Sequence, residues 1–375
     1  MGKRFLVVTE EWAGSGHRMA AEALVEELCA SEGVDSARLV GGLETASPAL
    51  RELSRFFYLG MLRLAPPLWQ RIYEREQLWS TSLQKPLAWW LSRKLTRELL
   101  KKEQPDVVIA THAYCLSALA RAKREMDAPF HLVSIPTDFH VNHFWVHPQI
   151  DTYVVAHEQL AEVLKRDFQV HADKIQVHGI PVRPAFRAAG ERDKPTWRAA
   201  LGLSPEMFTV LVSGGEGGYG GIAEVLQELV RIQEPLQIIV VTGKNAKLKR
   251  QLDDWQQKTP NLRHHLLIRG YESQMWQWIS AADVYISKPG GITCAEALAL
   301  KTPLLLYKPL PGQERRNSAF LRHNQAAAVA NTPMEIRETL NRWRIRLEGQ
   351  KEIEKIEQVR RPEAARQTAE YLLGL

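Results

Sequence analysis

The sequence is poor in cysteine and has no long apolar run, and both absences exclude classes of protein. Cys29, Cys115 and Cys294 lie far apart among 375 residues and form no Cys-x-x-Cys pair. A disulfide framework or a structural zinc site is therefore not expected, and a reducing compartment fits. No stretch approaches the roughly 20 apolar residues that cross a bilayer, and the run at 5–8 is too short for a signal-peptide core. Any membrane contact is expected to be peripheral.

Charge of neither sign dominates the chain. Lysine and arginine number 49 and aspartate and glutamate 43, which leaves a net charge of +6. So small an excess does not distinguish nucleic acid, anionic lipid or an anionic small molecule as the partner. The length of 375 residues exceeds one ordinary hydrophobic core and suits two domains of roughly 150 to 200 residues each.

Short apolar runs alternate with helical patterns along almost the whole chain. Fully apolar strands separated by helices indicate parallel sheets that are covered on both faces. Two series of such runs predict two Rossmann-like α/β halves. The expected linker follows residues 179–184, where prolines break regular structure, and runs through the charged residues 187–198. The expected strands are 5–8, 107–109, 131–135, 153–155, 208–213, 237–241, 284–286 and 304–307.

One segment departs from this alternation. Residues 49–102 carry eleven Lys or Arg against four Glu, together with Trp69, Trp79, Trp89 and Trp90. Basic side chains mixed with aromatic ones are typical of helices that lie in a lipid headgroup layer. We therefore predict that residues 51–102 contact an anionic membrane surface; the alternative is an insertion that packs its aromatic side chains on the domain. No nucleic-acid-binding motif accompanies the segment, so no nucleic acid partner is expected.

The first of three glycine-rich turns follows the expected strand at 5–8. It contains Gly14, Gly16 and His17 and precedes a helical pattern over 19–28. Glycine lets the backbone pass close to a ligand, and a helix N-terminus offers free N–H groups. The His17 imidazole can titrate near neutral pH, which suits a general base; a structural role at the helix start is the alternative.

The other two turns predict a nucleotide site in the second half. Six of the nine residues at 213–221 are glycine, more than a tight turn requires, which favours close approach of a phosphate or sugar. No Gly-Lys-Ser or Gly-Lys-Thr follows, so this is not a Walker loop. The third turn, at residues 287–293, opens a helix whose first N–H groups would face an anion. Glu296, one turn further, could accept two ribose hydroxyls. A solvated helix carboxylate is the alternative for Glu296.

Several motifs occur along the chain in an order that is typical of one family. They are the residues 14–17, 136–140 with 144–147, 179–182, 288–293 with Glu296, and 311–314 with Asn317. In this order they resemble the monogalactosyldiacylglycerol synthase and processive diacylglycerol glucosyltransferase family. They are more distantly similar to the peptidoglycan transferase that adds N-acetylglucosamine to an undecaprenyl-linked acceptor.

The resemblance implies a GT-B fold, in which two Rossmann-like parallel-sheet domains face each other across a cleft. Residues 1–184 would form the acceptor domain, 185–355 the UDP-sugar domain, and 356–375 a C-terminal helix that packs back on the first domain. It also implies an inverting transfer of glucose or galactose from UDP-hexose to a diacylglycerol-type lipid. The expected location is the cytoplasmic face of the cell membrane.

The glycine-rich turns and the resemblance together assign residues to roles. His17 would be the base, with Asp138 as the second candidate and His140 and the glycines 14 and 16 lining the acceptor loop. The residues that would hold the donor are Ser213, Gly214, Gly215, Gly217, Tyr271, Gly290, Gly291, Ile292, Thr293, Glu296, Gln313 and Glu314. Tyr271 would line the uracil pocket, and Gln313 and Glu314 would lie near the sugar hydroxyls. No Asp-x-Asp triplet occurs, so neither a metal nor another cofactor is expected.

Three other functions remain open from the sequence. A GT-B relative could use a polyprenyl-linked or other acceptor. A nucleotide-sugar epimerase shares the two-domain architecture and would act on UDP-sugar without lipid. A catalytically silent sensor would bind UDP-sugar and membrane but release no UDP.

Overall fold

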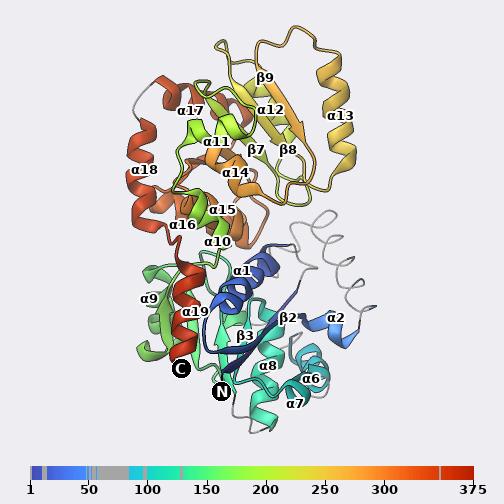
Figure 1. The fold of residues 1–375 in the computed structure, drawn as a ribbon, viewed down its shortest axis with the longest axis vertical. Helices are drawn as coiled ribbons and strands as arrows, with labels where there is room; N and C mark the ends of the chain where they lie inside the picture. The colour runs from blue at the N-terminus through green and yellow to red at the C-terminus, as the bar shows by residue number, and fades with distance from the viewer. Residues whose placement is uncertain are drawn as a thin grey trace. The chain divides into compact units, whose positions relative to one another are not determined.

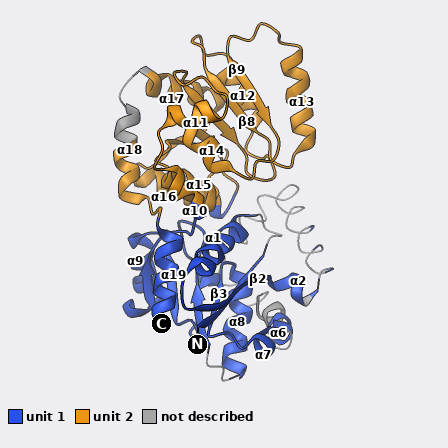
Figure 2. Cartoon of the chain, in the orientation of Figure 1, with its two compact units in different colours: residues 1–184, 311–313, 363–375 blue, residues 185–310, 314–362 orange. Residues whose placement is uncertain are grey.

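A computed structural model describes residues 2–10, 15–47, 49, 52, 56, 84–95, 99–126, 130–345 and 348–375. Its contacts divide the chain into two compact units, coloured separately in Figure 2. Unit 1 comprises residues 1–184, 311–313 and 363–375, and unit 2 comprises residues 185–310 and 314–362. Both are α/β units built on one parallel sheet each.

Unit 1 contains a six-stranded sheet in the order β2-β1-β3-β4-β5-β6, with every neighbouring pair parallel. The inner strands read as unbroken apolar runs because helices cover both faces of a parallel sheet. The strands are β1 (Lys3–Thr9), β2 (Val34–Gly41), β3 (Val107–Ala110), β4 (His131–Ser134), β5 (Thr152–Val155) and β6 (Ile175–Val177).

The helices of unit 1 include one from the far end of the chain. They are α1 (Gly16–Ala30), α2 (Gly42–Ala46), α6 (Gln84–Leu95), α7 (Lys101–Glu103), α8 (Ala113–Met126), α9 (Glu158–Phe168) and α19 (Ala364–Gly374), with 3-10 turns η2 (His143–Trp145) and η3 (Ala172–Lys174). Helix α19 packs beside α1 (Figure 1). Its Ala369 and Leu372 belong to the same buried cluster as Phe5 and Leu24. The Lys3 ammonium donates to the Leu373 carbonyl at 2.7 Å. The last turn of α19 is thereby tied to β1.

Unit 2 contains a second six-stranded parallel sheet, in the order β12-β11-β10-β7-β8-β9. Its strands are β7 (Thr209–Ser213), β8 (Gln237–Val241), β9 (His265–Arg269), β10 (Val284–Ser287), β11 (Leu304–Tyr307) and β12 (Ala328–Ala330). Its helices are α10 (Pro184–Ala189), α11 (Lys194–Ala200), α12 (Ile222–Leu229), α13 (Ala246–Gln257), α14 (Met275–Ala281), α15 (Gly291–Ala299), α16 (Gln313–His323), α17 (Pro333–Ile345) and α18 (Glu348–Val359).

The expectation of a linker through residues 187–198 is wrong. Proline at the start of a helix is compatible with helical structure, since the N–H that it lacks would have no partner there. Pro184 accordingly begins α10, and the Asp193 side chain caps α11 by accepting the Thr196 N–H at 2.9 Å. Trp197 is buried, so this stretch is part of the core of unit 2.

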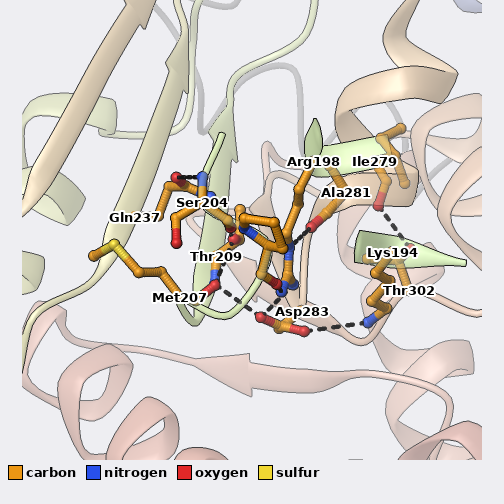
Figure 3. A network of polar contacts seen from close by, with 11 residues as sticks. Lys194, Arg198, Ser204, Met207, Thr209, Gln237, Ile279, Ala281, Asp283 and Thr302 are labelled. Atoms are coloured by element: carbon orange, nitrogen blue, oxygen red, sulfur yellow. Dashed lines mark hydrogen bonds and ion pairs between the residues drawn. The ribbon is translucent and has the colours of Figure 1, made fainter. Parts of the chain in front are cut away.

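A buried arginine fixes α11 to the amino ends of the strands in unit 2 (Figure 3). The Arg198 guanidinium donates to the Ala281 carbonyl at 2.9 Å, to the Pro205 carbonyl at 2.8 Å and to the Asp283 carboxylate at 2.6 Å. The same Asp283 oxygen accepts the Thr209 N–H at 2.8 Å. Since a buried charge is costly without partners, these bonds are what permits Arg198 to be buried.

Candidate active site

In unit 1 the carboxyl ends of three neighbouring strands lie side by side. The register pairs Val8 of β1 with Ala110 of β3, and Ala110 with Ser134 of β4. The carboxyl edge of such a sheet is where open α/β folds bind ligands. The segments that follow β1, β3 and β4 meet at this edge, and His17 lies in the first of them.

His17 is the second residue of α1, and hydrogen bonds hold both its ring and its backbone. Its Nδ1 lies 2.6 Å from the Thr137 hydroxyl, and the Thr111 hydroxyl donates to the His17 carbonyl at 3.0 Å. Gly16 begins the helix, whereas Gly14 lies outside the described residues. The ring therefore has a defined orientation at the start of α1.

A second histidine, which the motifs did not single out, lies against this ring. His112 is buried, and its ring centroid lies 4.7 Å from that of His17, with the planes at 88°. Its Nδ1 accepts the Tyr114 backbone N–H at 3.3 Å. Burial lowers the pKa of His112 well below its usual value, and the proximity of His17 lowers it further. His112 is therefore a neutral neighbour that packs edge-on against His17.

Asp138 and His140 lie in the same loop as Thr137. Asp138 is 9% exposed, and its charge acts on His17. Burial lowers the pKa of His17, while the Asp138 carboxylate raises it part of the way back. An imidazole that is neutral at pH 7 beside a carboxylate that stabilises its protonated form can act as a general base. His140 lies two residues further on and is partly exposed.

In unit 2 the glycine loop follows β7 and folds on itself. Ser213 ends the strand, and its hydroxyl accepts the Gly215 N–H at 3.2 Å. A Cβ at Gly214 would lie 1.9 Å from the Tyr219 carbonyl oxygen, and one at Gly217 would lie 2.2 Å from the Tyr219 ring. These two glycines were predicted to contact the donor. The structure gives another reason for glycine at these two positions, because the loop cannot fold this way with a side chain at either of them.

Two other positions of the loop face a lysine instead. Gly215 and Gly220 have φ angles of 69° and 83°, which L-residues with side chains rarely adopt. A Cβ at either would lie 3.5 Å from the side chain of Lys288. This side of the loop therefore faces Lys288, in the segment that follows β10.

That segment leads into the N-terminus of α15. Ser287, at the end of β10, pairs with Ser213 at the end of β7. Gly290 is the N-cap and supplies no capping side chain, and the first turn contains no acidic residue. The first N–H groups of a helix lack intrahelical partners and carry partial positive charge, which suits an anion. The residues of this turn are Gly291, Ile292 and Thr293.

Lys288 brings a full positive charge to this helix start. Its Nζ lies 3.8 Å from where a Cβ of Gly290 would stand, and it forms an ion pair with Glu314. The other Glu314 oxygen accepts the Leu310 N–H at 2.9 Å. Glu314, predicted near the sugar hydroxyls, is buried and holds both the lysine and the loop before α16. Gln313, its predicted companion, is partly exposed at the start of that helix.

The two remaining donor candidates follow β10 and β9, as the glycine loop follows β7. The carboxylate of Glu296 is close enough to the buried Tyr285 phenol to add to the effect of burial, which raises the pKa of Tyr285. Tyr271 follows β9 and is 54% exposed. The Lys244 ammonium lies 5.2 Å from the centre of its ring and pairs with Glu216 of the glycine loop. The exposed ring is thus linked to the loop and free on its outer side to stack on a base.

Comparison with known proteins identifies the family. The model of the monogalactosyldiacylglycerol (MGDG) synthase family matches residues 17–182, and that of the glycosyltransferase family 28 C-terminal domain matches residues 209–358. A Bacillus licheniformis protein named processive diacylglycerol beta-glucosyltransferase is 31% identical over 340 residues, which cover 90% of this chain and 86% of that protein. The chain belongs to the MGDG synthase family of glycosyltransferases. It is a hexosyltransferase.

Solved structures support the GT-B fold of this family member. MurG of Acinetobacter baumannii has a TM-score of 0.65 and 15% identity, with 100% of both chains covered. The UDP-GlcNAc 2-epimerase of Neisseria meningitidis, solved with UDP-GlcNAc bound, has a TM-score of 0.62 and 15% identity, covering 99% of this chain and 100% of its own. At such identities the likeness shows the fold alone. The prediction of a GT-B fold is confirmed.

The predicted membrane residues of this glycosyltransferase fall largely outside the described part. Trp69 and Trp79 lie outside it, as does the side chain of Trp89. Trp90 is partly exposed on α6, a helix that packs on α8. Within the described ranges, no helix combines the length and the apolar character needed to cross a bilayer.

Proposed function

We propose that this glycosyltransferase moves glucose or galactose from a UDP-hexose to diacylglycerol, or to a glycosyl-diacylglycerol, with inversion at the anomeric carbon. The observation that carries the proposal is the 31% identity over 90% of the chain to a protein named processive diacylglycerol beta-glucosyltransferase. Both halves of the chain match models of glycosyltransferase families, which favours transfer over a silent sensor.

Unit 2 would hold the donor. The diphosphate would accept N–H groups from Gly291 to Thr293 at the start of α15 and meet the positive charge of Lys288. Glu296 would accept the ribose hydroxyls, and the exposed ring of Tyr271 would stack on uracil. Negative charge grows on the departing UDP, and fixed N–H dipoles stabilise it without reorganising.

No metal would be needed to bind the donor. The sequence contains no Asp-x-Asp triplet, and within the described ranges no three His, Cys, Asp or Glu side chains gather as metal ligands. The N–H groups at the helix start, with Lys288 beside them in its ion pair with Glu314, offer the positive potential that a metal would otherwise bring to the diphosphate. Activity that survives chelation would agree with this arrangement.

Unit 1 would activate the acceptor. The lipid hydroxyl has a pKa far above 7, so it must lose its proton as it attacks. His17, neutral at pH 7, would take the proton, and Asp138 would stabilise the imidazolium that forms. Asp138 is the second candidate for the base itself.

The reaction would take place at the cytoplasmic face of the cell membrane, where the acceptor lipid lies. The basic, tryptophan-rich segment 51–102 would attract anionic headgroups, each Lys or Arg near the surface being worth about 1 kcal/mol. Binding to vesicles that contain anionic lipid should therefore weaken as salt is raised.

The test combines donors and acceptors. The full chain is incubated with vesicles containing diacylglycerol and with UDP-glucose, UDP-galactose or UDP-GlcNAc in turn, and UDP release is measured. Mass spectrometry identifies the lipid product and NMR its anomeric configuration; parallel reactions contain EDTA, or a polyprenyl-linked sugar in place of diacylglycerol. We expect a β-hexosyl lipid from UDP-glucose or UDP-galactose, with EDTA changing the rate less than about twofold. Transfer only to the polyprenyl acceptor, or epimerised donor without lipid product, would contradict the proposal.

A further inference from the structure

A buried threonine lies at the ring of the proposed base. Thr137 is 4% exposed, and its Oγ1 lies 2.6 Å from Nδ1 of His17. A backbone group of Thr111 also forms a hydrogen bond with the His17 ring. With Thr137 at Nδ1, Nε2 is the nitrogen that would take a proton from a substrate.

The chemistry of a general base decides which tautomer must be present. A neutral imidazole carries one proton, either on Nδ1 or on Nε2. Only the tautomer with the proton on Nδ1 leaves the Nε2 lone pair able to accept a proton. In that tautomer Nδ1–H must donate, and Thr137 Oγ1 is the oxygen in place to accept it.

We propose that Thr137 is a positioning residue, whose hydroxyl oxygen accepts Nδ1–H of His17 and thereby holds the imidazole in the tautomer that can deprotonate the acceptor. The inference rests on the proposed role of His17. The acceptor O–H proton passes to Nε2, its oxygen forms the bond to the anomeric carbon, and the bond from that carbon to the UDP oxygen breaks with its electron pair leaving on UDP.

The acceptor that the structure places at Nδ1 is a neutral hydroxyl, not a carboxylate. A carboxylate in hydrogen-bond contact would favour the imidazolium and raise the pKa of His17, so that less base would be present near pH 7. Thr137 fixes the tautomer without adding charge. Asp138, the next residue, supplies the charge that stabilises the imidazolium once it has formed, and His112 and Thr111 hold the ring and backbone of His17 from other sides.

Three variants test the inference. Thr137→Val removes the hydroxyl at nearly constant volume, and Thr137→Ser restores it. Thr152→Val is the matched control, because the buried Thr152 hydroxyl lies 2.8 Å from Nε2 of a different histidine, His131, at the amino end of β5. Turnover and donor KM are measured for each variant. Nitrogen-15 NMR of histidine-labelled protein reads the tautomer of His17, assigned by the signal that His17→Gln removes.

We expect the proton on Nδ1 in the natural chain. Thr137→Val should lower kcat about tenfold, leave the donor KM unchanged and move the proton of His17 toward Nε2. Thr137→Ser should recover most of the turnover, and Thr152→Val should keep both the turnover and the His17 signal. If Thr137 were merely structural, Thr137→Val would leave the tautomer of His17 unchanged. It would also not lower kcat without changing the donor KM.

Two results would overturn the inference. One is a proton on Nε2 of His17 in the natural chain. The other is a Thr137→Val variant with unchanged kcat and an unchanged His17 signal. Both can be told apart from failure of the proposed function, in which the natural chain itself transfers no hexose to diacylglycerol. Should Thr137→Val not fold, the spectrum of the natural chain and the Thr137→Ser variant still decide the matter.

Discussion

The two units place different chemistry at the same edge of similar sheets. In unit 1 the polar groups at the carboxyl ends of the strands are side chains, with His17 hydrogen-bonded to Thr137 and its pKa raised by the charge of Asp138. In unit 2 they are largely backbone groups, from the glycine loop and the start of α15, reinforced by Lys288. Proton transfer needs a titratable side chain, whereas an anion can be held by N–H groups. Changes in unit 1 should therefore alter turnover, whereas changes in unit 2 should alter donor affinity or stability.

The largest effect is expected from His17→Ala. General-base catalysis contributes about 10²- to 10⁴-fold to the rate, so kcat should fall by that factor while UDP affinity, measured by calorimetry, stays within about twofold. His171→Ala serves as control, because His171 is an exposed histidine of the same unit, paired with Asp173. A folded His17→Ala protein with near-normal turnover would remove His17 from the role of base.

Arg198→Met should destabilise unit 2 and leave the stability of unit 1 unchanged. Removing one partner of a buried ion pair costs about 3–5 kcal/mol when the other charge is left uncompensated; the loss should be smaller here, because Lys194 also pairs with Asp283 at 3.6 Å. Arg198 is 5% exposed and bonded to Asp283. Hydrogen exchange followed by mass spectrometry should show faster exchange in peptides of unit 2 and unchanged exchange in unit 1.

Arg166→Met is the matched control for that variant. Arg166 is exposed on α9 of unit 1 and pairs with Asp167, and exposed pairs contribute little. We expect no measurable change in exchange. Equal effects of the two substitutions would show that the Arg198 bonds in Figure 3 do not hold unit 2 together.

The strands that the sequence predicted and those that it missed differ in position. The eight expected strands are the inner ones, whose residues are almost all buried. The four missed strands, β2, β6, β9 and β12, are the outermost strands of the two sheets. An outer strand is partly exposed and needs no unbroken apolar run, as the Asp35, Ser36 and Arg38 of β2 illustrate. Hydrophobic pattern therefore finds the middle of a parallel sheet and not its edges.

The site was predictable where its signal is local and not where it depends on tertiary register. His17 and the start of α15 stand out because glycine precedes a helix in each case. The partners of those groups do not stand out. Thr137 reaches His17 from 120 positions away, and Glu314 reaches Lys288 from 26 positions away. The role of Gly217 was also not readable, because the contact that forbids a side chain there exists only once the loop has folded.

Glu296→Ala should give the next largest effect, on donor affinity alone. Hydrogen bonds to a charged group are worth about 1.5–3 kcal/mol, so UDP should bind about 10- to 100-fold more weakly while kcat at saturating donor changes little. The natural chain should also prefer UDP to its 2′-deoxy analogue, and Glu296→Ala should not. Glu338→Ala, an exposed helix position of unit 2, is the control. Unchanged UDP affinity in Glu296→Ala would remove the ribose role.

The smallest effect is expected in the pH dependence of turnover, and it separates the two candidates for the base. Burial holds the pKa of His17 below its ordinary value of about 6.5, with Asp138 opposing. A base must be unprotonated, so kcat should be constant above pH 6.5 and fall as the pH drops through that lowered pKa. Asp138→Asn removes the opposing charge, so the midpoint should move further down. Glu296→Ala should leave the midpoint in place, since it acts in unit 2. An upward shift of the midpoint in Asp138→Asn would contradict the effect of the Asp138 charge on His17. Loss of turnover at every pH in this variant would make Asp138 the base.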